Sequence, residues 1–284
     1  MKHAYLIIAH GEYNLLNILV NMIDDVRNDI FIHIDKKSPL PSECITVKKS
    51  NIYYVVNRVD VRWGDISQIE TELILFEKAC TTNRYDYYHL LSGVDLPIKS
   101  QNFIHDFFSE YAGRNFVGYA QYEVNPSSVM KYHFFTKYYK HNNFLPKVYY
   151  SILRICAESM ANWLCQRKSY GEWKKGANWV SITDDFCRYL VNRKEFILRR
   201  YRYTRCADEY FLQTELWNSS YRSTIYRLDD EFKGCLRLID WVRGKPYVWT
   251  IHDREIIESS NCLFARKFSS REIEIVNWIY KTYS

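Results

Sequence analysis

AYLIIAHGEYNLLNILVNMIDDVRNDIFIHID, residues 4–35, is the stretch that decides the fold. Residues 4–9 form an apolar run typical of a buried strand, and residues 13–23 repeat apolar side chains at helical spacing. A second apolar run, residues 30–34, ends at Asp35. A strand, a helix and a second strand in this order predict the start of a parallel α/β sheet.

Three polar residues, His33, Asp35 and Lys36, stand at the end of the second strand. In open α/β sheets ligands bind beyond the carboxyl ends of the strands, so a nucleotide could be bound here. A polar turn after a strand has the same pattern, and the residues alone leave both interpretations open.

A turn and a helix come next. Arg62-Trp63-Gly64 follows a third short strand at residues 52–56. We expect Ser67 to cap the next helix, with Glu70 as the acid of a capping box.

The segment SGVDLP, residues 92–97, follows a further predicted strand at residues 87–91. Its Gly allows close backbone approach, its Pro fixes a turn, and Asp95 adds a carboxylate, which together are typical of a ligand loop. Many ordinary strand exits look the same. Farther along, residues 127–175 are rich in Tyr, Lys, His and Asn, and we expect an insertion or lid with a helix at residues 148–166.

RCADEYFLQTELWNS, residues 205–219, predicts a helix from residue 207 to 216 with Asp208 and Glu209 in its first turn. Acids at this position complement the helix dipole, so the local pattern favours capping for both. Glu209 also stands among Tyr210 and Trp217, where aromatic walls could bind a ring-shaped ligand and raise the pKa of a carboxyl group.

The last third carries scattered cations, at positions 243, 245, 254, 266 and 267. They could converge on one anion if the loop at residues 243–246 packs against residues 263–268. The sequence has no Asp-x-Asp, and its nearest acid pairs, Asp229 with Glu231 and Asp253 with Glu255, are typical of a turn and a helix start. We therefore predict no metal site.

Composition limits the possible classes of protein. The 284 residues are 47% hydrophobic, 25% charged and 17% aromatic, as in a soluble globular protein with many flat side chains for packing or carbohydrate stacking. The net charge of +6 favours anionic partners but is small for a nucleic-acid binder, which would need a basic stripe. Motifs typical of dinucleotide-binding proteins, P-loop NTPases, serine hydrolases and zincins are absent.

The eight cysteines form no CxxC pair, and the first apolar run is too short to span a membrane and has no small-residue cleavage site. We expect reduced thiols and a cytoplasmic protein, which could contact the anionic inner face of a membrane peripherally.

Six motifs follow one another along the chain as in a known family. They are HIDKKS at 33–38, VRWGDIS at 61–67, DYYHLLSGVDLPIKS at 86–100, KKGANWVSIT at 174–183, ADEYFLQT at 207–214 and SSNCLFARKF at 259–268. The chain resembles the core-2/I-branching β-1,6-N-acetylglucosaminyltransferases, a family that includes the peptide O-xylosyltransferases. It resembles a bacterial-type member, since the animal members carry a Golgi anchor and disulfides.

The resemblance implies a GT-A type fold, with a Rossmann-like mixed central sheet flanked by helices. It implies one domain over residues 1–284, with a nucleotide-binding half (1–125) and an acceptor-binding and catalytic half (126–284). The implied activity is transfer of N-acetylglucosamine or xylose from a UDP-sugar to a hydroxyl of a glycan or lipid-linked oligosaccharide, with inversion and without cofactor or metal, in polysaccharide biosynthesis.

The resemblance also implies roles for single residues. Glu209 would be the base, and Lys267, with Arg243 or Lys245, would meet the diphosphate. The other implied donor-binding residues are Asp35, Trp63, Gly64, Asp95 and Arg266, and the implied acceptor-binding residues are Trp241 and Asp208. A non-catalytic nucleotide-sugar or glycan-binding protein on the same fold is the alternative.

Overall fold

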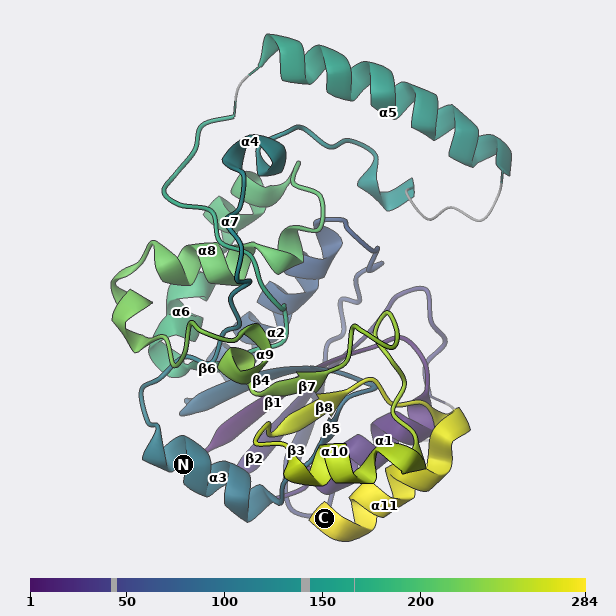
Figure 1. The fold of residues 1–284 in the computed structure, drawn as a ribbon, viewed down its shortest axis with the longest axis vertical. Helices are drawn as coiled ribbons and strands as arrows, with labels where there is room; N and C mark the ends of the chain where they lie inside the picture. The colour runs from purple at the N-terminus through teal and green to yellow at the C-terminus, as the bar shows by residue number, and fades with distance from the viewer. Residues whose placement is uncertain (42–44, 139–143, 166) are drawn as a thin grey trace.

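The central element is a five-stranded sheet in the order β3-β2-β1-β4-β6, seen in a computed structural model that describes residues 1–41, 45–138, 144–165 and 167–284 (Figure 1). The strands are β1 (His3–Ala9), β2 (Asn28–Ile34), β3 (Asn51–Tyr54), β4 (Tyr87–Ser92) and β6 (Ser181–Thr183). The first four pair in parallel, and β6 pairs antiparallel with β4. The predicted α/β class with a mixed, Rossmann-like sheet is therefore confirmed.

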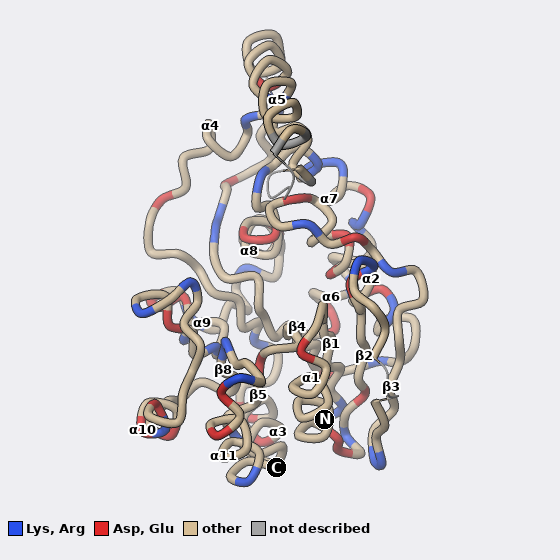
Figure 2. Tube along the Cα trace, turned by 90° about the vertical axis from the view of Figure 1, so that its right-hand side faces the viewer, with Lys and Arg blue, Asp and Glu red and all other residues tan. Residues whose placement is uncertain are grey.

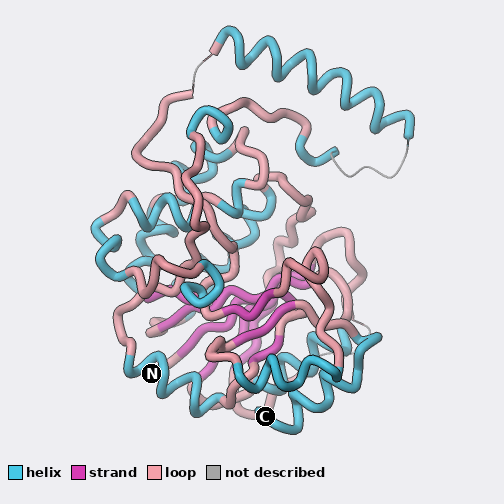
Figure 3. The backbone as a smooth tube through the Cα atoms, in the orientation of Figure 1, coloured by secondary structure: helices cyan, strands magenta, loops and turns pink. Residues whose placement is uncertain are grey.

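A second, three-stranded sheet has the order β5-β8-β7 (Figure 3). Its strands are β5 (Leu96–Pro97), β7 (Arg237–Ile239) and β8 (Phe264–Arg266). β5 comes from the first half of the chain, whereas β7 and β8 come from the second. Because β7 and β8 run parallel, the residues after them, Asp240 and Lys267, lie at the same edge.

The helices complete the layers. Their bounds are α1 (Tyr13–Met22), α2 (Ser67–Thr82), α3 (Gln101–Glu110), α4 (Pro126–Val129), α5 (Phe144–Leu164), α6 (Asp184–Asn192), α7 (Lys194–Tyr201), α8 (Phe211–Trp217), α9 (Glu231–Cys235), α10 (Arg254–Ser259) and α11 (Ile273–Tyr283). The end of the helix predicted at residues 148–166 falls on Gln166, which lies outside the described residues.

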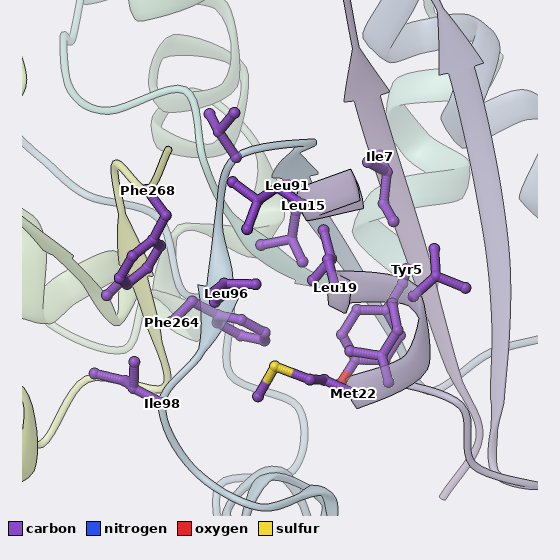
Figure 4. Close-up of a cluster of buried hydrophobic side chains, with 14 of the residues drawn as sticks. Tyr5, Ile7, Leu15, Leu19, Met22, Leu91, Leu96, Ile98, Phe264 and Phe268 are labelled. Carbon is purple, nitrogen blue, oxygen red and sulfur yellow. The ribbon is translucent and has the colours of Figure 1, made fainter. Parts of the chain in front are cut away.

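Alternation along β1 divides the core between the two faces of the large sheet. Tyr5 and Ile7 pack with α1, α11 and the small sheet, in the cluster drawn in Figure 4. Ala4 and Leu6 pack on the opposite face with α2, α6 and α8. Each large apolar side chain fully buried in these clusters contributes about 1.5–3 kcal/mol to the free energy of unfolding.

Two local predictions are wrong in detail. Ser67 is not a cap, because α2 starts at Ser67 itself and its hydroxyl accepts a hydrogen bond from the Arg62 amide. The helix expected at residues 207–216 is broken at Tyr210, where φ is −123° and ψ is −36°. A 3₁₀ turn, η2 (Ala207–Glu209), precedes the break and α8 follows it.

Candidate functional site

Glu209, at the end of η2, lines a cavity of about 230 Å³. Trp241, Trp179, Lys175 and Glu231 also line this cavity. Trp241 follows β7, so the structure brings together two residues that the resemblance assigns to catalysis and acceptor binding.

The Glu209 carboxylate forms an ion pair with the Lys175 ammonium, with 3.0 Å between Oε2 and Nζ. Burial opposes the charge of Lys175, but the bonds to Glu209 outweigh burial and hold the pKa of the ammonium above its ordinary value. The Glu209 side chain remains 40% exposed. It is therefore held in place by a cation and still open to the cavity.

Neither acid of η2 caps a helix, contrary to the interpretation that the local pattern favours. Asp208 is 5% exposed, and its Oδ2 accepts hydrogen bonds from Gln68 (2.9 Å) and Asn178 (3.3 Å). Burial, followed by the negative charge of Glu209, raises the pKa of Asp208 to about 7. Because its carboxyl group bonds inward, the acceptor contact implied for Asp208 remains a prediction.

A second buried carboxyl group, that of Glu72, stands near Asp208. It is 1% exposed on α2, and burial, together with the charge of Asp208, raises its pKa well above the ordinary range. One oxygen of each carboxyl group has no hydrogen-bond partner among the described residues. An acid in such a place is more stable in its neutral form.

The backbone beneath the cavity is tightly packed at two glycines. A Cβ on Gly176 would lie 1.9 Å from the Gly118 carbonyl oxygen, and a Cβ on Gly118 would lie 2.4 Å from the Glu231 carbonyl oxygen. Only glycine fits either position. The Gly176 amide also donates to the Glu209 carbonyl at 2.9 Å, so this packing fixes the backbone that carries Glu209.

The Trp63-Gly64 turn lies next to the Glu209 segment. The Gly64 carbonyl accepts a hydrogen bond from the Cys206 amide (3.1 Å), and Gly64 adopts a φ of +72°, which favours glycine. Trp63 is 46% exposed, and the Arg205 guanidinium lies over its ring at 5.5 Å. A flat, open side chain is thus held beside η2.

Asp35 is linked to the same turn through charges. Its carboxylate pairs with Lys37 at 2.8 Å, Lys37 also pairs with Asp60, and Asp60 pairs with Arg62, each at 2.7 Å. These ion pairs therefore link the carboxyl end of β2 to residues 60–62, directly before the Trp63-Gly64 turn. Direct contact of these residues with uridine remains a prediction.

Asp95 and Arg266 form an ion pair with each other. The Arg266 guanidinium lies 3.0 Å from the Asp95 carboxylate, which also accepts hydrogen bonds from the amide and the hydroxyl of Ser92. The same guanidinium lies over the ring of Trp179 at 4.5 Å, and Trp179 lines the Glu209 cavity. Asp95 thus holds Arg266 against a wall of this cavity.

The three cations that the resemblance places at the diphosphate differ in their surroundings. Arg243 pairs with Asp240 (2.5 Å) and Asp253 (2.6 Å), and these bonds raise its pKa. Lys267 is half-buried and Lys245 is exposed, and within the described part of the chain neither has a carboxylate within 4.0 Å. Lys267 is the better placed of these two for an anion, since it is already partly removed from water.

Sequence reasoning missed Lys175, Trp179 and Glu231 as functional candidates. Lys175 and Trp179 belong to the motif KKGANWVSIT, which was one signal for the family, but nothing in it indicates a role. Glu231 belongs to an acid pair that is typical of a turn or a helix start; it is the first residue of α9, and its side chain also lines the cavity. Burial raises the pKa of the Glu231 carboxyl group.

A second cavity, of about 520 Å³, adjoins the first. The two share Ala120, Tyr122 and Lys175 as lining residues. The second cavity is lined by four aromatic residues, Tyr119, Tyr122, Trp173 and Trp217, and by four charged ones, Glu123, Glu172, Lys174 and Lys175.

Residues 3–260 match the family model described as Branch: Core-2/I-Branching enzyme. The chain belongs to this family. The match includes the first five motifs and extends into the sixth, which confirms the predicted resemblance. The mixed sheet agrees with the GT-A type fold expected for a core-2/I-branching family member.

Two further proteins are similar to this family member. A xylosyltransferase of Ciona intestinalis is 25% identical over 308 residues, which cover 100% of this chain and 34% of that protein. The chain thus spans about a third of the length of this relative. Mouse xyloside xylosyltransferase 1, in its apo form, aligns over 95% of this chain and 98% of that chain, with a TM-score of 0.41 and 8% identity. This structural likeness is too weak to transfer any property.

Proposed function

We propose that the protein is an inverting glycosyltransferase that moves a sugar from a UDP-sugar to a hydroxyl of a glycan, with Glu209 as the base. The observation that carries the proposal is that the Glu209 carboxylate and the flat aromatic ring of Trp241 line the same cavity. Membership of the core-2/I-branching family and the similarity to a protein named xylosyltransferase support transfer over mere binding.

The step requires one base. The acceptor oxygen attacks the anomeric carbon while its proton passes to the Glu209 carboxylate. The bond between the anomeric carbon and the phosphate oxygen breaks, and its electron pair leaves with UDP. Attack from the face opposite to the leaving group inverts the anomeric centre. Lys175 orients the carboxylate by its 3.0 Å ion pair, so little reorientation is needed in the reaction.

The leaving diphosphate needs cations, and Lys267 is the proposed one. Its ammonium has no carboxylate partner among the described residues, so it can bind an anion without giving up an ion pair. Lys245 is the proposed second cation, because Arg243 would first have to leave two carboxylates. These cations would do the work of a metal, which the reaction then would not need.

The acceptor is proposed to be a carbohydrate. Trp241 is 53% exposed and offers a face on which a sugar ring can stack. The adjoining aromatic cavity gives room for further sugars of an oligosaccharide, free or lipid-linked. The donor sugar is N-acetylglucosamine or xylose by family resemblance.

Glu209→Gln tests the proposal. The variant keeps the shape of the side chain but cannot take the proton, so transfer should fall about 10²- to 10⁴-fold. UDP should still protect the variant against heat as it protects the wild type. Glu231→Gln is the matched control, because it removes the other carboxylate of the same cavity.

Three outcomes separate the possible roles. A fall of about 10²- to 10⁴-fold in Glu209→Gln, with near-normal activity in Glu231→Gln, supports Glu209 as the base. The reverse pattern would assign the base to Glu231. A wild-type protein that binds UDP-sugars and never turns them over, across a panel of donors and glycans, would be a non-catalytic nucleotide-sugar or glycan-binding protein.

A further inference from the structure

Helix α5 makes its contacts through a largely polar side and exposes its apolar side, whereas an ordinary surface helix buries its apolar side. The side bearing Tyr150, Glu158 and Asn162 packs on residues 132–138, the segment before the helix. Tyr150 stacks on Tyr138 with 3.7 Å between ring centroids, and Glu158 accepts a hydrogen bond from the Phe134 amide. Asn162 accepts one from the Tyr132 amide. In a helix that only completes a core, the apolar side would make these contacts.

The apolar side of α5 is exposed. Its large exposed side chains are Leu145, Val148, Tyr149, Ile152, Leu153, Ile155, Met160, Trp163 and Leu164. At 3.6 residues per turn these positions fall on one side of the helix, over about half of its circumference. Trp163 is 84% exposed and Leu145 is 78% exposed. Figure 1 shows α5 at the outer end of the molecule, away from both sheets.

Positive charge is concentrated in the same part of the chain. Residues 126–170 contain seven Lys and Arg but one acid, Glu158, a surplus of six. The whole chain contains 39 Lys and Arg against 33 acids, also a surplus of six, so the remainder is balanced. Figure 2 shows both basic and acidic stretches beneath α5, around α7.

We propose that α5 lies in the surface of an anionic lipid bilayer, with its apolar face inserted among the acyl chains and the surrounding cations near the lipid phosphates. An exposed apolar face within a cationic segment fits a charged interface, and Trp and Tyr side chains are favoured at that depth. None of the described helices has the length and apolar character needed to cross a bilayer, so the helix binds in the plane.

A second copy of the chain fits this face less well. Pairing two α5 helices would bring together two segments that each carry a surplus of six positive charges. Like charges at this distance repel, whereas anionic lipids neutralise each segment separately. The proposal does not depend on the transfer reaction, since no residue of the Glu209 cavity takes part.

Flotation of the full chain with lipid vesicles tests the proposal. Binding is expected to vesicles of equal parts phosphatidylglycerol and phosphatidylcholine, and to be weak on phosphatidylcholine alone. Ile152→Ser and Trp163→Ser should each weaken partitioning about tenfold. Val26→Ser is the matched control, since Val26 is 71% exposed in the loop before β2, far from α5 in sequence.

Three results would overturn the proposal. The first is equal vesicle binding of the wild type and the Ile152→Ser variant, and the second is no binding of either; in both cases the circular dichroism spectra of the two proteins must agree. The third is a dimer in vesicle-free solution that Ile152→Ser dissociates, which would make the face a contact between two copies. Salt at 0.5 M should weaken binding of the wild type, because it screens the lipid charges to within about 4 Å.

Discussion

Replacing Asp208 by Asn should make the protein more stable at high pH and change little at low pH. The pKa of the buried carboxyl group is about 7, against an ordinary value of 3.8. Between these values the unfolded chain has lost the proton and the folded chain still holds it, so stability falls as pH rises. The full cost above pH 7 is about 4 kcal/mol, and the part between pH 5 and pH 8 is about 3 kcal/mol.

Urea denaturation, followed by tryptophan fluorescence, measures this difference. The quantity compared is the free energy of unfolding of wild type minus Asp208→Asn, at pH 5 and at pH 8. An Asn carbonyl can still accept the hydrogen bonds from Gln68 and Asn178, so the difference at pH 5 should be only the part of the cost already present there, about 1–2 kcal/mol. Asp106→Asn, at an exposed position of α3, is the control. A difference that stays constant between the two pH values would refute the buried, protonated Asp208.

Two further predictions concern Lys267 and the cysteines. Transfer should survive EDTA, and activity restored only by manganese would contradict this. Lys267→Ala should lower transfer on the order of 10²- to 10³-fold and weaken UDP binding, whereas the exposed control Lys281→Ala should do neither. A small loss of stability with unchanged UDP affinity in Lys267→Ala would contradict the role of Lys267. Thiol titration of the denatured, non-reduced protein should find all eight cysteines free, since the Sγ atoms of Cys80 and Cys187, though close, are 3.2 Å apart. Fewer thiols would indicate disulfides.

Sequence patterns predicted the elements whose cause is local. The apolar run at residues 4–9 and the helical spacing at 13–23 became β1 and α1, because burying those stripes requires a strand and a helix in that order. The break at Tyr210 had no such signal. It arises because η2 is held from outside, by the Gly64 carbonyl on one side and the Gly176 amide on the other.

The candidate site was less predictable than the fold for the same reason. The catalytic role proposed for Glu209 comes from the family motifs, whereas the local residue pattern alone favours capping. Its partner Lys175 is 34 residues away and meets it only because Gly176 and Gly118 allow three backbone segments to approach. A contact of this kind depends on tertiary packing, which a single sequence does not display.

The acids in and near the cavity would repel an anionic donor if all of them were ionised. Glu209 and Glu231 line it with a single lysine, Lys175. Two buried acids are close by, since the charge of Asp208 interacts with that of Glu209, and Glu72 interacts with Asp208. Four full negative charges would repel an anionic donor. Burial raises the pKa of Glu72 well above its ordinary range and leaves Asp208 about half protonated near pH 7, so part of that charge is absent. In the proposed reaction the diphosphate would therefore bind outside this cavity, at the edge where β7 and β8 end and Lys267 follows β8. The base and the cation of that reaction would then come from different elements, η2 and the segment after β8.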